Sequence, residues 1–286
     1  MSAWVGLSGT LTFLLLVTGC SVGAPRADPT SSPTSAPSTS ATSPPAVSAT
    51  PAAVPPAPPR TGCYRLTTKQ LTEPTNASTP VPCSGRHTSQ TILVGTLDTV
   101  VDGHAVAVDS TLVQRQLARR CPRALASYVG GTVEARRLSR FNVVWYSPTL
   151  EESDRGADWF RCDLIAFAGG DALFPLPGTR RLKGVLDRRR ALDDYGLCGT
   201  SAPGVRGFER VICGRRHSWR AVETIGLGGG KAYPGTRAVR RAGDEDCKDI
   251  AQARAEDALK FRYGWEWPTR AQWARGQRYG YCWVPD

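Results

Sequence analysis

Nine cysteines constrain the fold of this chain more than any other feature of its sequence. With Cys20 set aside, the other eight fall into two series of four, and in each series a short gap precedes two longer ones. The gaps are 20, 38 and 41 residues in the first series and 15, 34 and 35 in the second. An even number of cysteines outside the cytoplasm predicts disulfides. The eight are Cys63, Cys83, Cys121, Cys162, Cys198, Cys213, Cys247 and Cys282.

The residues around the cysteines repeat as well. VPCSGRH at 81–87 matches VICGRRH at 211–217, and a strand-like run follows each. Near the end of each series a Pro-Thr pair and an Arg-Gly pair lie at the same distances before the last cysteine: Pro148-Thr149 and Arg155-Gly156 before Cys162, Pro268-Thr269 and Arg275-Gly276 before Cys282. We therefore predict two copies of one module, at 62–172 and 190–286, joined by a basic loop around 180–190.

Local sequence favours one of the three pairings that four cysteines allow in each module. The first two cysteines flank a possible hairpin, the third lies on a predicted helix, and the fourth on the last predicted strand. Each bridge is expected to contribute roughly 2–4 kcal/mol, mainly by restricting the unfolded chain. The predicted bonds are Cys63–Cys83, Cys121–Cys162, Cys198–Cys213 and Cys247–Cys282.

Hydrophobic periodicity predicts an α+β module with a helix packed on a small antiparallel sheet. Apolar residues at helical spacing predict a helix over 110–129 with Ser110 as its N-cap, and a second helix over 246–261. Runs rich in β-branched and aromatic residues predict strands at 91–97, 142–146 and 159–167.

The N-terminus predicts a location outside the cytoplasm. The apolar run at 7–17 is too short for a confident membrane span and is typical of a signal-peptide core. It ends in VTGC at 17–20, which resembles a bacterial lipobox, so residues 1–19 are expected to be a lipoprotein signal peptide and Cys20 to carry the lipid. The usual basic residues before the core are missing from MSAWVGLSG. An ordinary secreted protein and an uncleaved membrane anchor are the alternatives.

Residues 20–61 are dominated by Pro, Ser, Thr and Ala. Such a composition cannot bury enough apolar surface to offset its ordering entropy, so we expect a disordered tether. In polyproline II form some forty residues reach on the order of 100 Å. The tether would hold the folded part on the outer face of the cytoplasmic membrane while letting it reach into the cell wall.

The second module resembles the septum formation family of actinobacterial envelope proteins. The matching elements are a cysteine, a Cys-x-x-x-His before a strand, Tyr233-Pro234-Gly235, a cysteine on a helix, and a final Pro-Thr-x-x-x-Trp-x-x-Gly-x-Arg-x-x-x-Cys at 268–282. The first module fits less well, because it lacks Tyr-Pro-Gly and has Ser153 and Asp158 in place of the Trp and Arg. The resemblance implies a setting in division or envelope growth, and it implies no catalytic mechanism.

The Cys-x-x-x-His motif has three readings. Zinc binding and nucleophilic catalysis both need a reduced cysteine, which an oxidising compartment would consume. A Ser84–His87 pair lacks an evident orienting acid, and the second copy has Gly214 at that position. We therefore expect His87 and His217 to be structural, each capping or hydrogen-bonding the turn before its strand, and we expect no metal, cofactor or catalytic residue. GLGGGK at 226–231 has the wrong spacing for a phosphate loop and is expected to be a flexible connection.

Tryptophans and arginines supply the candidate binding residues. Four tryptophans crowd the end of the second module, where core packing is the ordinary expectation and an aromatic platform for a sugar or peptide is the functional one. The net charge is +11, and ten of these charges lie from Thr61 onward, which favours anionic lipids and wall polymers as partners. The candidates are Trp265, Trp267, Trp273, Arg215, Arg216, Arg220 and Arg278.

These features predict a non-enzymatic envelope lipoprotein that binds an anionic wall polymer, peptidoglycan or a division protein. Nucleic acid would satisfy the same charge but not the expected location. A wall-modifying hydrolase is the alternative, and it would need paired carboxylates or a triad. The acidic clusters at 151–152 and 244–246 are expected to be solvated loop or helix-start residues instead.

Overall fold

The computed structural model describes residues 53–178 and 181–286. The predicted signal peptide, Cys20 and most of the predicted tether lie outside the described residues. In the described part, no helix is both long enough and apolar enough to cross a membrane.

The first sheet carries the strands predicted for the first module. Its order is β1-β2-β6-β5, with a short strand, β7, paired to the far end of β6. All pairings are antiparallel. The strands are β1 (Cys63–Tyr64), β2 (Ser89–Thr96), β5 (Phe141–Tyr146), β6 (Trp159–Gly169) and β7 (Ala172–Leu173). A separate two-stranded ribbon is formed by β3 (Val100–Val101) and β4 (His104–Ala105).

The second sheet repeats this topology. Its order is β11-β12-β10-β8-β9, so β8, β10, β12 and β11 take the places of β1, β2, β6 and β5. A register shift falls between Thr91 and Leu93 in β2 and between Ala221 and Glu223 in β10, which are equivalent positions. The strands are β8 (Leu197–Gly199), β9 (Arg210–Ile212), β10 (Trp219–Gly226), β11 (Gly264–Glu266) and β12 (Tyr279–Pro285).

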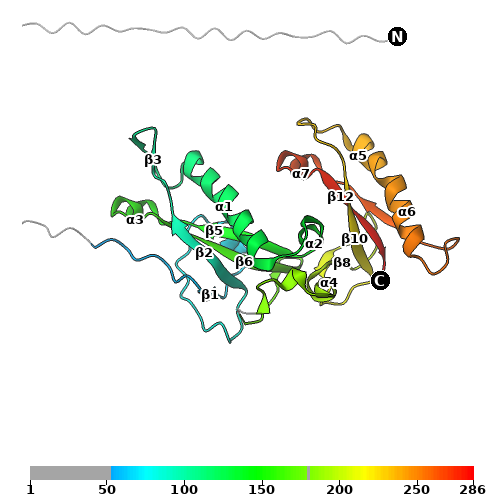
Figure 1. Cartoon of the computed structure of the whole chain (residues 1–286), viewed down its shortest axis with the longest axis horizontal. Coiled ribbons are helices and arrows are strands. Elements are labelled where there is room, and N and C mark those ends of the chain that lie inside the picture. The colour runs from blue at the N-terminus through cyan, green and yellow to red at the C-terminus, as the bar shows by residue number, and fades with distance from the viewer. Residues whose placement is uncertain (1–52, 179–180) are drawn as a thin grey trace, which may run out of the picture. The chain divides into compact units, whose positions relative to one another are not determined.

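A long helix packs on the first sheet as predicted. It is α1 (Thr111–Val129), and its N-cap Ser110 accepts a hydrogen bond from the backbone N–H of Val113. Figure 1 shows α1 crossing one face of the sheet, where it contacts β2, β5 and β6. Its buried stripe includes Leu117 and Cys121. The α+β class is therefore confirmed.

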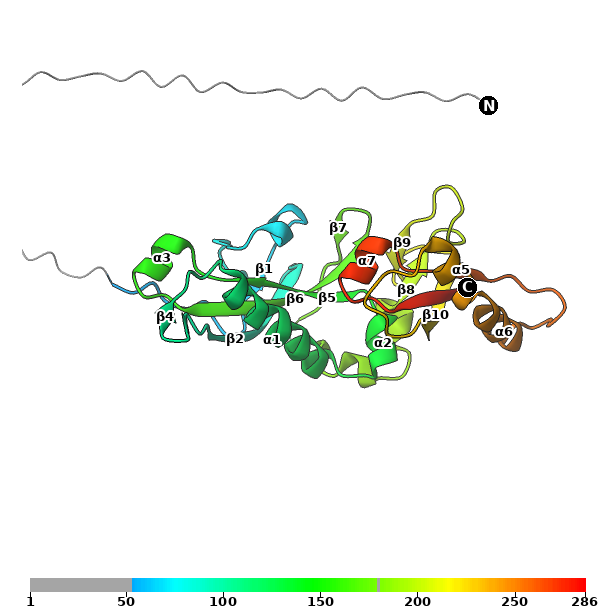
Figure 2. The same ribbon diagram turned by 90° about the horizontal axis from the view of Figure 1, so that it is seen from above.

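The second predicted helix ends earlier than expected. Instead of 246–261, the chain forms α5 (Thr236–Ala242) and α6 (Asp244–Arg254), and α6 packs against β11 and β12 (Figure 2). Ala255 is extended, and the residues after it form a loop whose Leu259 is 92% exposed. The predicted apolar stripe ended in residues that have no surface to pack against, so the helix stops one turn after its last buried residue, Ala251.

Short helices complete the two copies. Two of them, α3 (Leu150–Asp154) and α7 (Arg270–Ala274), follow the repeated Pro-Thr pair and begin with the same capping box. Glu152 is a member of the first box, which confirms that the 151–152 acids lie at a helix start. The others are η1 (Lys69–Thr72), α2 (Val133–Arg137), η3 (Val185–Asp187) and α4 (Ala191–Tyr195).

Four disulfides join the cysteine pairs that the sequence predicted. One bond in each copy ties the first strand to the turn before the long strand: Cys63–Cys83 and Cys198–Cys213. The other ties the helix to the last strand: Cys121–Cys162 and Cys247–Cys282. The helix-to-sheet bonds are fully buried, so they are part of the core as well as crosslinks.

The segment between the copies is more than the basic loop predicted for it. Leu182, Val185 and Leu186 are buried and pack in one cluster with Leu164 of β6 and Ile212 of β9. Leucine and valine in this segment thus close a core to which both copies contribute, while its arginines face outward. The sequence prediction gave weight to the charge and missed the apolar residues between the charges.

Candidate functional site

Both histidines hydrogen-bond the turn that precedes their strand. Nδ1 of His87 donates to the carbonyl oxygen of Gly85 at 2.8 Å, and Nδ1 of His217 donates to that of Arg215 at 2.6 Å. The bond spans two residues in each copy and fixes the tight turn after the second cysteine. The turn-binding geometry expected from the sequence is therefore present in both modules.

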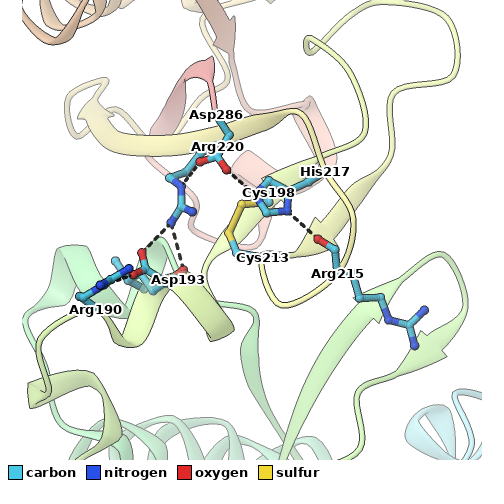
Figure 3. A network of polar contacts seen from close by, with 9 residues as sticks. Arg190, Asp193, Cys198, Cys213, Arg215, His217, Arg220 and Asp286 are labelled. Carbon is cyan, nitrogen blue, oxygen red and sulfur yellow. Dashed lines mark hydrogen bonds and ion pairs between the residues drawn. A yellow bond between two sulfur atoms is a disulfide. The ribbon is translucent and has the colours of Figure 1, made fainter.

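In the second copy, the histidine also belongs to a chain of charged contacts (Figure 3). Nε2 of His217 lies 2.7 Å from Oδ2 of Asp286, and the guanidinium of Arg220 binds the other oxygen of that carboxylate. Arg220 also pairs with Asp193 at 3.2 Å, and Asp193 pairs with Arg190 at 2.7 Å. The Arg220 hydrogen bond is the largest of the effects that lower the pKa of Asp286. The chain of contacts links the end of β12 to α4.

The sulfur atoms of Cys198 and Cys213 lie within 4.8 Å of a ring nitrogen of His217, which is the donor set of a zinc site. The two sulfur atoms are bonded to each other at 1.98 Å, however, so neither is a thiolate. Metal binding there would need reduction of the bond that ties β8 to the turn after β9. In this state the cluster does not fit a metal ion.

The tryptophans do not form the exposed platform considered from the sequence. Trp265 is 6% exposed and Trp273 is 2% exposed, and Nε1 of Trp265 donates to the carbonyl oxygen of Val239. Trp283 is fully buried, and Trp267 is half-buried with Arg240 over its ring. The tryptophans pack into the core from different elements. Trp265 of β11 shares a cluster with Cys247 of α6, and Trp283 of β12 shares another with Trp219 of β10, while Trp273 lies on α7.

The four candidate arginines separate into two kinds. Arg220 is held by Asp286 and Asp193, and Arg278 lies 4.2 Å over the ring of Trp273 while its Nε donates to the carbonyl oxygen of Gly230. The side chains of Arg220 and Arg278 are therefore held by contacts within the fold. Arg215 and Arg216 are exposed, and within residues 53–178 and 181–286 no ion pair joins either guanidinium to a carboxylate.

A hollow of about 420 Å³ lies on the segment between the copies, and sequence reasoning did not single it out. We call it the linker arginine pocket, after Arg181, Arg188, Arg189 and Arg190, which line it with Asp193, Asp194 and Tyr195. Arg190 has a left-handed backbone (φ 68°) and pairs with Asp193. Across residues 53–178 and 181–286, no ion pair joins the other three arginines to a carboxylate. In the sequence, the run of three arginines at 188–190 was the signal that could have indicated this pocket.

A buried ion pair is the other feature that the sequence did not reveal. Asp163 is fully buried and binds Arg161, Ser89 and Thr91 at 3.1, 3.0 and 2.8 Å. Burial raises the pKa of the Asp163 carboxyl. The guanidinium of Arg161 lies 3.8 Å from the ring centroid of Tyr64. Because both side chains are buried, this network holds the strands together rather than presenting a surface.

Comparison with protein families gives a match to the septum formation family over residues 38–147 and again over 134–282. The two matches indicate two tandem copies of the family's domain, although their limits differ from the predicted module boundaries, which stay a prediction. No curated protein and no solved structure matches the chain. The matched regions together extend over most of the sequence, and the chain belongs to the septum formation family.

Proposed function

We propose that this protein acts in septum formation as a lipid-anchored envelope protein that binds an anionic polymer of the cell wall without catalysing a reaction. Membership of the septum formation family supports the setting. The linker arginine pocket is the observation that carries the binding role. Four arginines and two aspartates line this hollow, and among the described residues Arg181, Arg188 and Arg189 form no ion pair with a carboxylate.

The electrostatics of the pocket favour an oxyanion. A guanidinium presents a rigid fork of donors that matches phosphate and carboxylate oxygens. Like charges held close together repel one another, and a bound anion relieves that repulsion. The net charge of +11 over the chain adds a long-range attraction to polyanions.

The disulfides support a location outside the cytoplasm, because structural disulfides persist in oxidising compartments. Lipidation of Cys20 would fix the chain to the outer face of the membrane, and residues 20–61 would let the folded part reach the wall.

A fluorescent fusion is expected to gather at septa in dividing cells, and Cys20→Ala is expected to release the protein from the membrane fraction. A fusion spread evenly over the cytoplasm would contradict the proposal.

Co-sedimentation of the full chain with purified, phosphate-rich wall polymer tests the binding role. We expect the double variant Arg188→Gln/Arg189→Gln to bind several-fold more weakly than the wild type, and binding by the wild type to weaken as salt rises. The matched control is Arg115→Gln/Arg119→Gln, which removes the same charge from exposed positions on α1. Equal loss in both double variants would show that only net charge matters, and the pocket assignment would then be wrong.

Incubation of the full chain with purified cell wall tests the non-enzymatic part. The expected result is that the protein sediments with the wall and that no soluble fragments appear. Fragment release by the wild type that disappears after substitution of a single carboxylate would instead support a hydrolase.

A further inference from the structure

Two aspartates share the wall of the linker arginine pocket with its four arginines. The carboxylate of Asp193 is already bound, because Arg190 and Arg220 pair with it at 2.7 and 3.2 Å (Figure 3). Within residues 53–178 and 181–286, no ion pair involves Asp194. In the described chain the pocket therefore presents a carboxylate without a cation beside guanidinium groups without an anion.

The charged groups of the wall meet around the hydroxyl of Tyr195. Burial is the main cause that raises the pKa of this hydroxyl; the Asp194 carboxylate raises it further, and the guanidinium groups of Arg188 and Arg181 act in the opposite direction. Salt screens charges that lie far apart, so these three groups lie near the hydroxyl. The ring of Tyr195 stacks on that of Phe141 with 4.9 Å between centroids, which holds the hydroxyl among them.

A bare phosphate does not account for this arrangement. An ionised carboxylate only accepts hydrogen bonds, and it repels a phosphate that lies close to it. Asp194 therefore needs a donor on the ligand, which is either a hydroxyl or an ammonium group. Four arginines against two aspartates leave the wall positively charged, and this charge disfavours an ammonium group but not a neutral hydroxyl.

We propose that the linker arginine pocket binds a phosphate ester that carries neighbouring hydroxyl groups, as a sugar phosphate or a polyol phosphate does. Arg181 and Arg188 bind the phosphate, and the two oxygens of Asp194 accept from the hydroxyls. The hollow of about 420 Å³ lies within the size range of small-molecule sites. This inference rests on the proposed function, because it names the chemical group that the same pocket recognises.

Calorimetric titration of the full chain with glycerol phosphate tests this inference. Propyl phosphate is the matched ligand, since it has the same length and charge but no free hydroxyl on its carbon chain. We expect glycerol phosphate to bind about tenfold more tightly, which is the contribution of one hydrogen bond to a charged group. Equal affinities would overturn the proposal. Tighter binding of phosphoethanolamine than of glycerol phosphate would also overturn it, because Asp194 would then bind an ammonium group.

The variant Asp194→Ala separates recognition of the hydroxyls from the charge of the pocket. The ratio of the two affinities should fall from about ten to about one, while propyl phosphate binds about twofold more tightly because a repelling charge is gone. Asp171→Ala is the matched control, which removes an exposed carboxylate elsewhere and should leave both affinities unchanged. A ratio that stays near ten in Asp194→Ala would refute the role of Asp194 and with it the proposal.

Failure of this inference can be told apart from failure of the proposed function. If Arg188→Gln/Arg189→Gln weakens wall-polymer binding while glycerol phosphate and propyl phosphate bind alike, charge alone holds the polymer and only the ligand assignment is wrong.

A hydroxyl-bearing phosphate can come from a wall polymer or from a lipid head group, and competition for the site bound to glycerol phosphate distinguishes these sources. We expect displacement by the phosphate-rich wall polymer. Displacement by vesicles that contain phosphatidylglycerol would support the same chemistry and assign it to the lipid head group. Displacement by neither would overturn the proposal.

Discussion

Nε of Arg161 donates to Oδ2 of Asp163 at 3.1 Å in the interior of the first copy, where the two side chains are 3% and 0% exposed. Both residues lie on β6 and point to the same face of the sheet. At the equivalent positions of β12 the second copy has Tyr281 and Trp283, which are buried with Trp219 in an apolar cluster. One fold thus supports a polar interior in one copy and an aromatic interior in the other.

Removal of one partner of this ion pair is expected to destabilise the fold strongly. Asp163→Ala leaves a guanidinium charge buried without a carboxylate, and breaking buried pairs in this way costs about 3–5 kcal/mol. Denaturant unfolding followed by tryptophan fluorescence measures the loss. The double variant Arg161→Met/Asp163→Leu leaves no charge unpaired and should recover most of it. A loss below about 1 kcal/mol for Asp163→Ala would mean that water reaches the pair.

The contact between Asp286 and Arg220 predicts a specific pH dependence of stability. The pKa of Asp286 is lowered in the folded state, so its contribution is fully present above the unfolded-state value near pH 4. The contribution is lost as the pH falls through the folded-state pKa. Asp286→Asn should therefore be about 0.5–1 kcal/mol less stable than the wild type at about pH 6, and the gap should close toward about pH 3.

Denaturant unfolding at a series of pH values tests that dependence. Asp171→Asn is the matched control, because Asp171 is exposed and its carboxylate makes no ion pair in the described structure. The control should show no gap at any pH. A gap for Asp286→Asn that stays constant down to about pH 3 would indicate a loss of packing rather than of charge.

The disulfides should differ in their effect on stability. Cys121–Cys162 closes a loop of 41 residues, while Cys198–Cys213 closes one of 15. Loop entropy alone makes removal of the longer bridge more costly by about 0.9 kcal/mol. Paired Cys→Ala variants compared by denaturant unfolding measure the difference, and a count of free thiols in the wild type should find none among these eight cysteines. Several free thiols would instead support zinc binding or nucleophilic catalysis by these cysteines.

Cysteine spacing and local repeats allowed much of the fold to be predicted. Ser110 before a regular apolar stripe located α1, because cap and stripe are encoded within one segment. The pairing of Cys121 with Cys162 followed from placing one on that helix and the other on the last strand. Such features depend on a few neighbouring residues, which a single sequence displays.

Features that depend on distant segments could not be predicted in this way. Alternation along β6 places Arg161 and Asp163 on the face opposite Cys162, and charged residues at alternate positions ordinarily indicate a solvated face. Here the loop around Asn76 covers that face, and Nη2 of Arg161 donates to the side-chain oxygen of Asn76 at 2.8 Å. The linker arginine pocket was missed for the same reason, because its shape depends on how Leu182 and Val185 pack beneath the charges.

At one cross-strand position the two copies place a glycine and a large residue on opposite strands, and this gives the last prediction. Gly95 faces Phe160 in the first sheet, and at the equivalent places Ile225 faces Gly280 in the second. A methyl group on Gly280 would come within 2.3 Å of the ring of Trp265 and 2.5 Å of the backbone oxygen of Glu266.

Gly280→Ala should therefore cost about 1–3 kcal/mol, since overpacking a filled interior forces side chains and backbone to shift. Gly229→Ala, where an added methyl group meets nothing within 4 Å, is the matched control and should change stability by less than about 0.5 kcal/mol. Thermal unfolding of both variants measures the contrast. Equal melting temperatures would show that the ring of Trp265 can move aside, and they would contradict tight packing of β11 on β12.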